Sequence, residues 1–87
     1  MQVMGTNTWE FDGPRDFLVQ KALEFADGLK AQGIAQLRDA CIARDQKLMW
    51  CAWDVDDFEA MQMAFKEMNE QTGLTSELTV VAEMYRA

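Results

Sequence analysis

The sequence predicts an α+β domain in which the elements follow one another as β-α-β-β-α-β, with both helices on one face of a four-stranded antiparallel sheet. Three observations predict this class. Two segments carry apolar residues at helical spacing, each is closed by a glycine, and the two apolar segments between them are separated by a short polar turn. At 87 residues the chain can build one hydrophobic core but not two, so we expect a single domain over residues 1–87.

The first strand is expected near Val3 to Phe11, and the first helix from Pro14 to about Gln32. Pro14 follows an Asp-Gly pair, and its fixed backbone angle suits the first turn of a helix. Gly33 is expected to end this helix. One apolar stripe runs along the helix, formed by Leu18, Ala22, Phe25, Ala26 and Leu29.

Two strands, Ile34 to Ala43 and Lys47 to Val55, are expected to form a hairpin through the polar turn at residues 44–46. The second of these strands is apolar on both sides. A strand with water on one side usually alternates apolar and polar residues, so we expect this one to be central and covered on both faces. Trp50 and Trp53 should point to opposite sides of a regular strand, so at most one of them lines a given cavity.

Asp56 and Glu59 have the spacing of a capping box and are expected to begin the second helix, which should end at Gly73. One side of this helix is apolar, and Met63 lies off that side, where we expect a surface position. A last strand is expected from Leu78 to Tyr85. The apolar side of the helix is formed by Phe58, Met61, Phe65 and Met68.

The sheet face opposite the helices would carry large apolar side chains from the central strand. Monomers seldom expose an apolar patch of that size. We therefore expect a second copy of the chain to cover this face, so that two sheets pack about a two-fold axis into a closed or nearly closed barrel.

The stretch from Gly33 to Tyr85 resembles the dimeric α+β barrel superfamily, a ferredoxin-like group that includes muconolactone isomerases and antibiotic-biosynthesis monooxygenases. The closest local likeness is the segment from Cys51 to Ala60, where a strand ending in an aromatic runs into a capped helix. The resemblance implies a ferredoxin-like homodimer. Haem-degrading members use an asparagine on the first strand with a tryptophan and a histidine. Asn7 is suitably placed, but this chain has no histidine, so no haem, nickel or other cofactor is expected.

Composition excludes several classes of partner and chemistry. Eight basic residues stand against fifteen acidic ones, giving a net charge of −7 with no basic stripe, so nucleic acid and anionic membranes are not expected as partners. The N-terminus lacks a signal-like core, and the longest apolar run, Leu48 to Trp53, is too short to span a membrane, so we expect a cytoplasmic protein. Without histidine, Ser-His-Asp and Cys-His mechanisms are excluded.

An acidic cluster at Asp54, Asp56, Asp57 and Glu59 could bind a hard cation, but the absence of EF-hand spacing favours helix capping, and no metal site is expected. The two cysteines, Cys41 and Cys51, lie in apolar stretches without a CxxC pair and are expected to be reduced core residues.

Polar and aromatic residues on neighbouring predicted strands are the candidates for lining a ligand cavity: Asn7, Trp9, Arg38, Trp53 and Tyr85. The favoured hypothesis is a homodimeric protein that binds a mostly apolar small molecule, either as a binding protein or as a cofactor-free enzyme. The alternative is a non-catalytic interaction module that presents an acidic surface to a basic protein. The sequence leaves open whether the protein is an enzyme.

Overall fold

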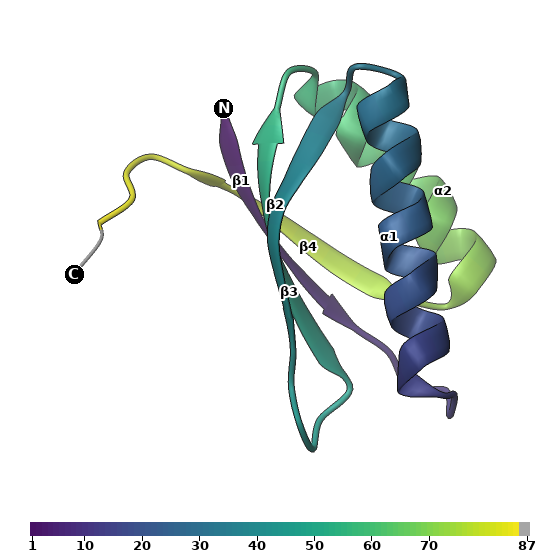
Figure 1. Cartoon of the computed structure of the whole chain (residues 1–87). Helices are drawn as coiled ribbons and strands as arrows, with labels where there is room; N and C mark the ends of the chain where they lie inside the picture. Colours follow the sequence, from purple (N-terminus) through teal and green to yellow (C-terminus); the bar gives the residue numbers. More distant parts are fainter. Residues whose placement is uncertain (86–87) are drawn as a thin grey trace.

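The computed structural model describes residues 1–85 and has the predicted order of elements (Figure 1). The four strands form an antiparallel sheet in the order β2-β3-β1-β4, which is the ferredoxin-like arrangement. The elements are β1 (Gln2–Thr8), α1 (Arg15–Ala31), β2 (Ala35–Ile42), β3 (Leu48–Val55), α2 (Phe58–Thr72) and β4 (Thr75–Val81).

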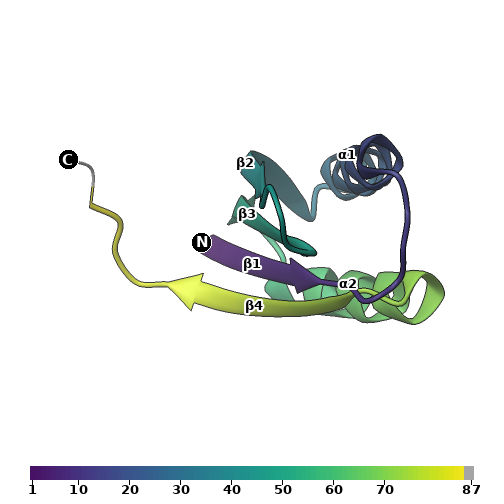
Figure 2. The ribbon, with the colours of Figure 1, turned by 90° about the horizontal axis from the view of Figure 1, so that it is seen from below.

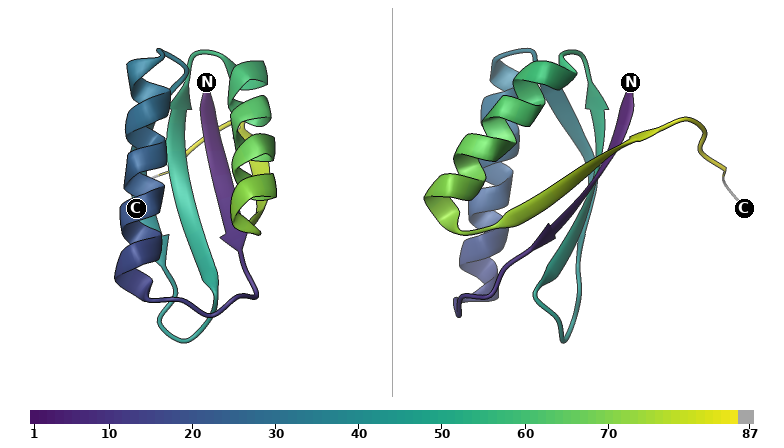
Figure 3. Two further views of the ribbon diagram at one scale, coloured as in Figure 1. Left: turned by 90° about the vertical axis from the view of Figure 1, so that its right-hand side faces the viewer. Right: turned by 180° about the vertical axis from the view of Figure 1, so that it is seen from behind.

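Both helices lie on one face of the sheet (Figure 2). Seen from the helix side, α1 and α2 stand at the two sides with the central strands β1 and β3 visible between them (Figure 3). The alternate residues of β3 that face the helices are buried, and Met61 and Phe65 of α2 pack with them. The expectation that one side of β3 is covered by the helices is therefore confirmed.

Glycine ends both helices as the sequence predicts. Gly33 and Gly73 have φ of 71° and 78°, a left-handed conformation that other residues adopt only with strain. The predicted capping box of Asp56 and Glu59 does not form, however, because the backbone N–H of Asp56 bonds to the Ile34 carbonyl and the cap lies one residue later. Asp57 is the N-cap of α2, and its carboxylate accepts a hydrogen bond from the backbone N–H of Ala60 at 3.0 Å, so Asp56 is not the capping residue.

The two outer strand ends also differ from the prediction. β1 stops at Thr8 rather than Phe11, and β4 covers Thr75–Val81 rather than Leu78 to Tyr85. The cause is the pairing: β4 begins opposite Thr8 and has no further partner once Val81 lies opposite Gln2. Residues 82–85 therefore leave the sheet, and the chain runs away from the helices (Figure 2).

The sheet face away from the helices is open in the isolated chain. Trp50 lies near its centre and is 42% exposed, and the register places Thr6 and Cys41 on either side of it. Cys41 is exposed on this face, so the prediction that both cysteines are core residues is wrong for Cys41, while Cys51 is buried and both are free thiols. Within residues 1–85 neither helix is long and apolar enough to cross a membrane.

A candidate ligand-binding cavity

An apolar cavity of about 620 Å³ opens between α1, α2 and the helix-facing side of the sheet. It exists because the first half of α1 does not complete its packing on the sheet. Ala26 and Leu29 are buried, whereas Phe17 and Leu23, nearer the start of the helix, are 54% and 51% exposed. Six aromatic side chains line the cavity: Trp9, Phe11, Phe17, Phe25, Trp53 and Phe65.

Edge-to-face aromatic contacts join the three walls of the cavity. The ring of Phe65 on α2 lies 5.0 Å from that of Phe25 on α1 and 5.8 Å from that of Trp53 on β3, both nearly perpendicular. Such pairs add to the stability gained from apolar burial. Phe65 is therefore the side chain that holds α1, α2 and β3 around the cavity.

Two basic side chains connect the segment between β1 and α1 with the β2–β3 turn. Arg15, at the start of α1, donates to the carbonyl oxygens of Ala43 and Arg44 at 2.8 and 2.6 Å. Lys47 donates to the carbonyl of Glu10 and to the carboxylate of Asp12, both at 2.9 Å, and lowers the pKa of Asp12 through the hydrogen bond and its charge. The segment between β1 and α1 is thereby tied to the hairpin.

The floor of the cavity contains one buried amide, that of Asn7, which is 6% exposed. Its Oδ1 accepts a short hydrogen bond of 2.6 Å from the Ser76 hydroxyl of β4. Its Nδ2 has only distant acceptors, the carbonyl of Met49 at 3.4 Å and Sγ of Cys51 at 3.7 Å. Both contacts are long and sulfur is a weak acceptor, so the Asn7 Nδ2 group is only weakly paired.

The direction of this network follows from the single hydrogen of Ser76. Because the hydroxyl donates to Asn7, it can only accept from its other neighbour, Asn69 of α2. With the Asn69 amide turned so that Nδ2 faces Ser76, it donates to Ser76 Oγ at 3.0 Å and to the Leu74 carbonyl at 3.3 Å. Asn7 Oδ1 is therefore fixed as an acceptor, and Nδ2 is directed toward β3 and the cavity floor.

Trp53, which also lines the cavity, carries a donor that is wholly unpaired. The indole Nε1 of Trp53 is buried and has no hydrogen-bond partner within residues 1–85. Buried N–H groups are usually paired, because leaving one unpaired costs free energy. The nitrogen lies beside Gly5, where a Cβ atom would be 3.6 Å from Trp53 Nε1 and 3.9 Å from Asn7 Nδ2. Two N–H donors thus flank the one strand position that has no side chain.

The floor carries no charge near neutral pH. Burial raises the pKa of Cys51 to about 11, despite the opposing hydrogen bond from Asn7, so its thiol stays protonated. Lys21 lines the cavity from α1, but its ammonium group pairs with Glu24 at 3.4 Å and lies 5.4 Å from the Phe17 ring centroid. The cavity is therefore neutral within and has one paired cation among its lining residues.

Of the five residues selected from the sequence, three line the cavity and two do not. Asn7, Trp9 and Trp53 line the cavity. Arg38 instead forms an ion pair with Asp54, whose position on β3 places it on the open side of the sheet, and Tyr85 is 86% exposed beyond the end of β4. Trp50 and Trp53 face opposite sides, as expected for a regular strand.

Several lining residues were assigned to the core from the sequence. Phe25, Phe65 and Met68 lie on apolar helix stripes, and the same spacing describes a buried residue and a cavity wall. Ser76, which orients Asn7, was not selected, because its predicted strand began two residues later. Only the strand register reveals it, since Ser76 lies directly opposite Asn7.

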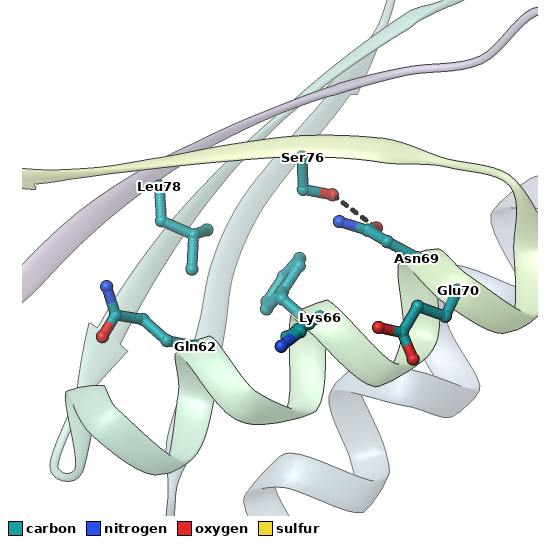
Figure 4. A pocket seen from close by; sticks show the side chains of 7 residues that line it. Gln62, Lys66, Asn69, Glu70, Ser76 and Leu78 are labelled. Carbon is teal, nitrogen blue, oxygen red and sulfur yellow. Dashed lines mark hydrogen bonds between the residues drawn. The ribbon is translucent and has the colours of Figure 1, made fainter.

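A second, shallower groove of about 460 Å³ runs between α2 and β4 (Figure 4). Gln62, Lys66 and Glu70 project from α2 along it, and Leu78 projects from β4. Its lining mixes charged and apolar groups and holds no convergent set of donors or acceptors beyond the Ser76–Asn69 pair. We assign it no binding role.

The acidic cluster after β3 does not converge. Asp57 caps α2 and Asp54 pairs with Arg38, and across residues 1–85 no three acidic or cysteine side chains are grouped so that they could hold a metal ion. Comparison of the sequence with models of known protein families gives no match, and comparison with curated proteins gives none either.

Proposed function

We propose that the protein is a homodimeric small-molecule-binding protein that holds a mostly apolar ligand in the cavity between α1, α2 and the sheet. The observation that carries the proposal is the cavity itself, whose volume of about 620 Å³ lies within the range of small-molecule sites. Like such sites, it combines a mainly apolar lining with a few polar groups. A protonated thiol, an amide and an indole N–H bind and orient a ligand, so the proposal is one of binding rather than of catalysis.

The proposed dimer uses the open face of the sheet, with a second copy as its cover. We call the residues around Trp50 the open-face patch: Met4, Thr6, Cys41, Trp50 and Ala52. These five residues are uncharged, and the acidic residues that the register pairs with Ala52 and Thr6, Asp39 and Glu77, lie beside them on the two edge strands. A two-fold axis would bring two such patches together and cover both Trp50 side chains.

The cavity can be tested with a variant that fills it. Ala22 lines the cavity on α1, and Ala31, on the same helix, is exposed and outside it. Ala22→Phe should weaken binding of the neutral dye Nile red about tenfold, since losing some 55 Å² of apolar contact corresponds to about 1.4 kcal/mol. Ala31→Phe should leave the affinity unchanged. Equal affinity of all three proteins would exclude the cavity as the site.

A native mass spectrum of freshly purified protein tests both parts of the proposal together. A dimer carrying extra mass supports a retained ligand and gives its size. A ligand-free dimer that binds neither Nile red nor any retained molecule would favour the alternative, an acidic interaction module, and a basic partner captured in a salt-dependent manner would then be its sign.

A further inference from the structure

We propose that residues 82–85 form an arm that reaches onto a second copy of the chain, where Met84 and Tyr85 pack on the open face of the partner's sheet. The arm supplements the open-face patch of the proposed dimer, so the inference rests on that part of the proposed function. Because a two-fold interface is reciprocal, each copy gives one arm and receives one.

The arm points to the side of the sheet where the second copy would lie. Val81 is opposite Gln2 at the start of β1, so the chain beyond it has no strand of its own to pair with. From there it runs away from the helices, on the side of the open face (Figures 1 and 2). Four extended residues span about 13 Å, and packed sheets lie about 10 Å apart. The arm is therefore long enough to reach the partner's sheet.

The arm carries apolar side chains that its own chain does not cover. Every residue of the arm is exposed, Met84 to 51% and Tyr85 to 86%. Met1 and Val80 lie at the same end of the sheet and are 63% and 49% exposed. The Tyr85 hydroxyl donates to the Glu83 carboxylate, so this polar atom keeps a partner when the ring is covered. Exposed apolar side chains gathered in this way are typical of a surface that contacts another molecule.

The size of the sheet face gives a second reason for an arm. The four strands are seven or eight residues long, and at about 3.3 Å per residue and 4.8 Å between strands they outline roughly 475 Å². The edge positions include Asp39 and Glu77, whose carboxylates favour water, so the apolar part is smaller. A specific interface usually covers about 800 Å² on each partner. Two arms extend the contact beyond the sheet and bring it closer to that size.

Variants of the arm test this contact through the dimer dissociation constant, measured by sedimentation equilibrium. Tyr85→Ser and Met84→Ser should each raise the constant at least about tenfold, as for other large side chains that contribute to an interface. Both positions lie beyond the last paired residue of β4, so the variants should keep the circular dichroism spectrum of the wild type. Met63→Gln removes an exposed apolar side chain from α2 and is the matched control, which should leave the constant unchanged.

A photo-crosslinking amino acid, benzoylphenylalanine, in place of Tyr85 locates the arm directly. On illumination it bonds to the groups that it contacts. Mixing unlabelled protein with isotope-labelled protein then identifies crosslinks between two chains by their mixed mass. We expect crosslinks between chains, to peptides from the strands of the partner's sheet and not from its helices.

The outcomes distinguish this inference from the proposed dimer. If the wild type is a dimer and both arm variants dissociate like the wild type, or the crosslinks stay within one chain, the arm is refuted while the dimer stands. Crosslinks to the partner's helices would show that association uses another face, and they would refute both the arm and the open-face dimer. A wild type that is monomeric at every accessible concentration would end the proposed dimer and the arm together, and would leave the ligand cavity to its own test.

Discussion

Replacing Trp50 should dissociate the proposed dimer. The side chain lies on the open face of the sheet and is 42% exposed. A tryptophan side chain presents roughly 250 Å², so the exposed part is about 100 Å². At about 25 cal/mol per Å², covering it contributes about 2.5 kcal/mol per subunit, or about 5 kcal/mol for two symmetric copies.

Ordering of side chains at an interface reduces such a figure, so we expect Trp50→Thr to raise the dimer dissociation constant by at least about a hundredfold. Threonine keeps a strand-forming residue at the position, and therefore the fold. Sedimentation equilibrium over a range of protein concentrations measures the constant. The control is Met63→Gln, which removes an exposed apolar side chain from α2 at a distance from the sheet.

Two results would refute this reasoning. A wild-type protein that stays monomeric at every accessible concentration would show that the open-face patch is tolerated in water. An equal weakening of the dimer by Trp50→Thr and Met63→Gln would show that association does not use the open face of the sheet.

Three further predictions concern the chain itself. Asp57→Ala should lower the free energy of unfolding by about 1 kcal/mol because it removes the α2 cap, whereas Asp56→Ala should change it little, as urea titration would show. Gly73→Ala should lower the free energy of unfolding by about 1 kcal/mol or more, since φ at Gly73 is 78°. Gly28→Ala, inside α1, should raise the free energy of unfolding by about 0.5–1 kcal/mol. An opposite result for either variant in thermal unfolding would contradict the assigned backbone conformation at that glycine. For the thiols, burial raises the pKa of Cys51 from 9.0 to about 11, so its protonated form favours the folded state below pH 9, and that contribution is lost as pH rises toward 11. Because Cys41 is exposed and Cys51 is buried, Cys41 should react with iodoacetamide at pH 8 well before Cys51. Equal labelling rates of the two thiols, measured by mass spectrometry, would argue against the burial of Cys51.

The fold could be predicted from the sequence because local signals agree with the tertiary structure. The apolar stripe of each helix, the glycines that end them and the polar turn of the hairpin all point to one order of elements. The signals that failed were local choices between equivalent neighbours. Asp56 and Asp57 are both good caps by residue type. The backbone of Asp57 adopts the extended N-cap conformation, and the N–H groups of both residues bond to the Ile34 carbonyl.

The site could be predicted only in part, since residue type shows what a side chain can do and not what lies beside it. Asn7, Trp9 and Trp53 were selected as polar or aromatic residues on neighbouring predicted strands, and they line one cavity. Arg38 and Tyr85 were selected in the same way, but Arg38 lies at a β-bulge of the edge strand and Tyr85 lies past the last residue that β1 can pair. Edge geometry and strand length are properties of the pairing, which the sequence does not reveal.

The central strand β3 shows why its apolar pattern needed two explanations. Its helix-facing residues are buried by the chain's own helices, so that half of the pattern is explained by folding alone. The opposite half, around Trp50, is left exposed by the part of the chain that the structure describes, and the first half of α1 likewise leaves apolar side chains in contact with a cavity. Apolar surface that folding does not bury costs free energy in water, so both features favour a bound molecule, one on each side of the same two central strands. Cys51 lines the cavity and its neighbour Trp50 lies on the open face, so the proposed ligand cavity and the proposed dimer contact are separated only by the thickness of the sheet.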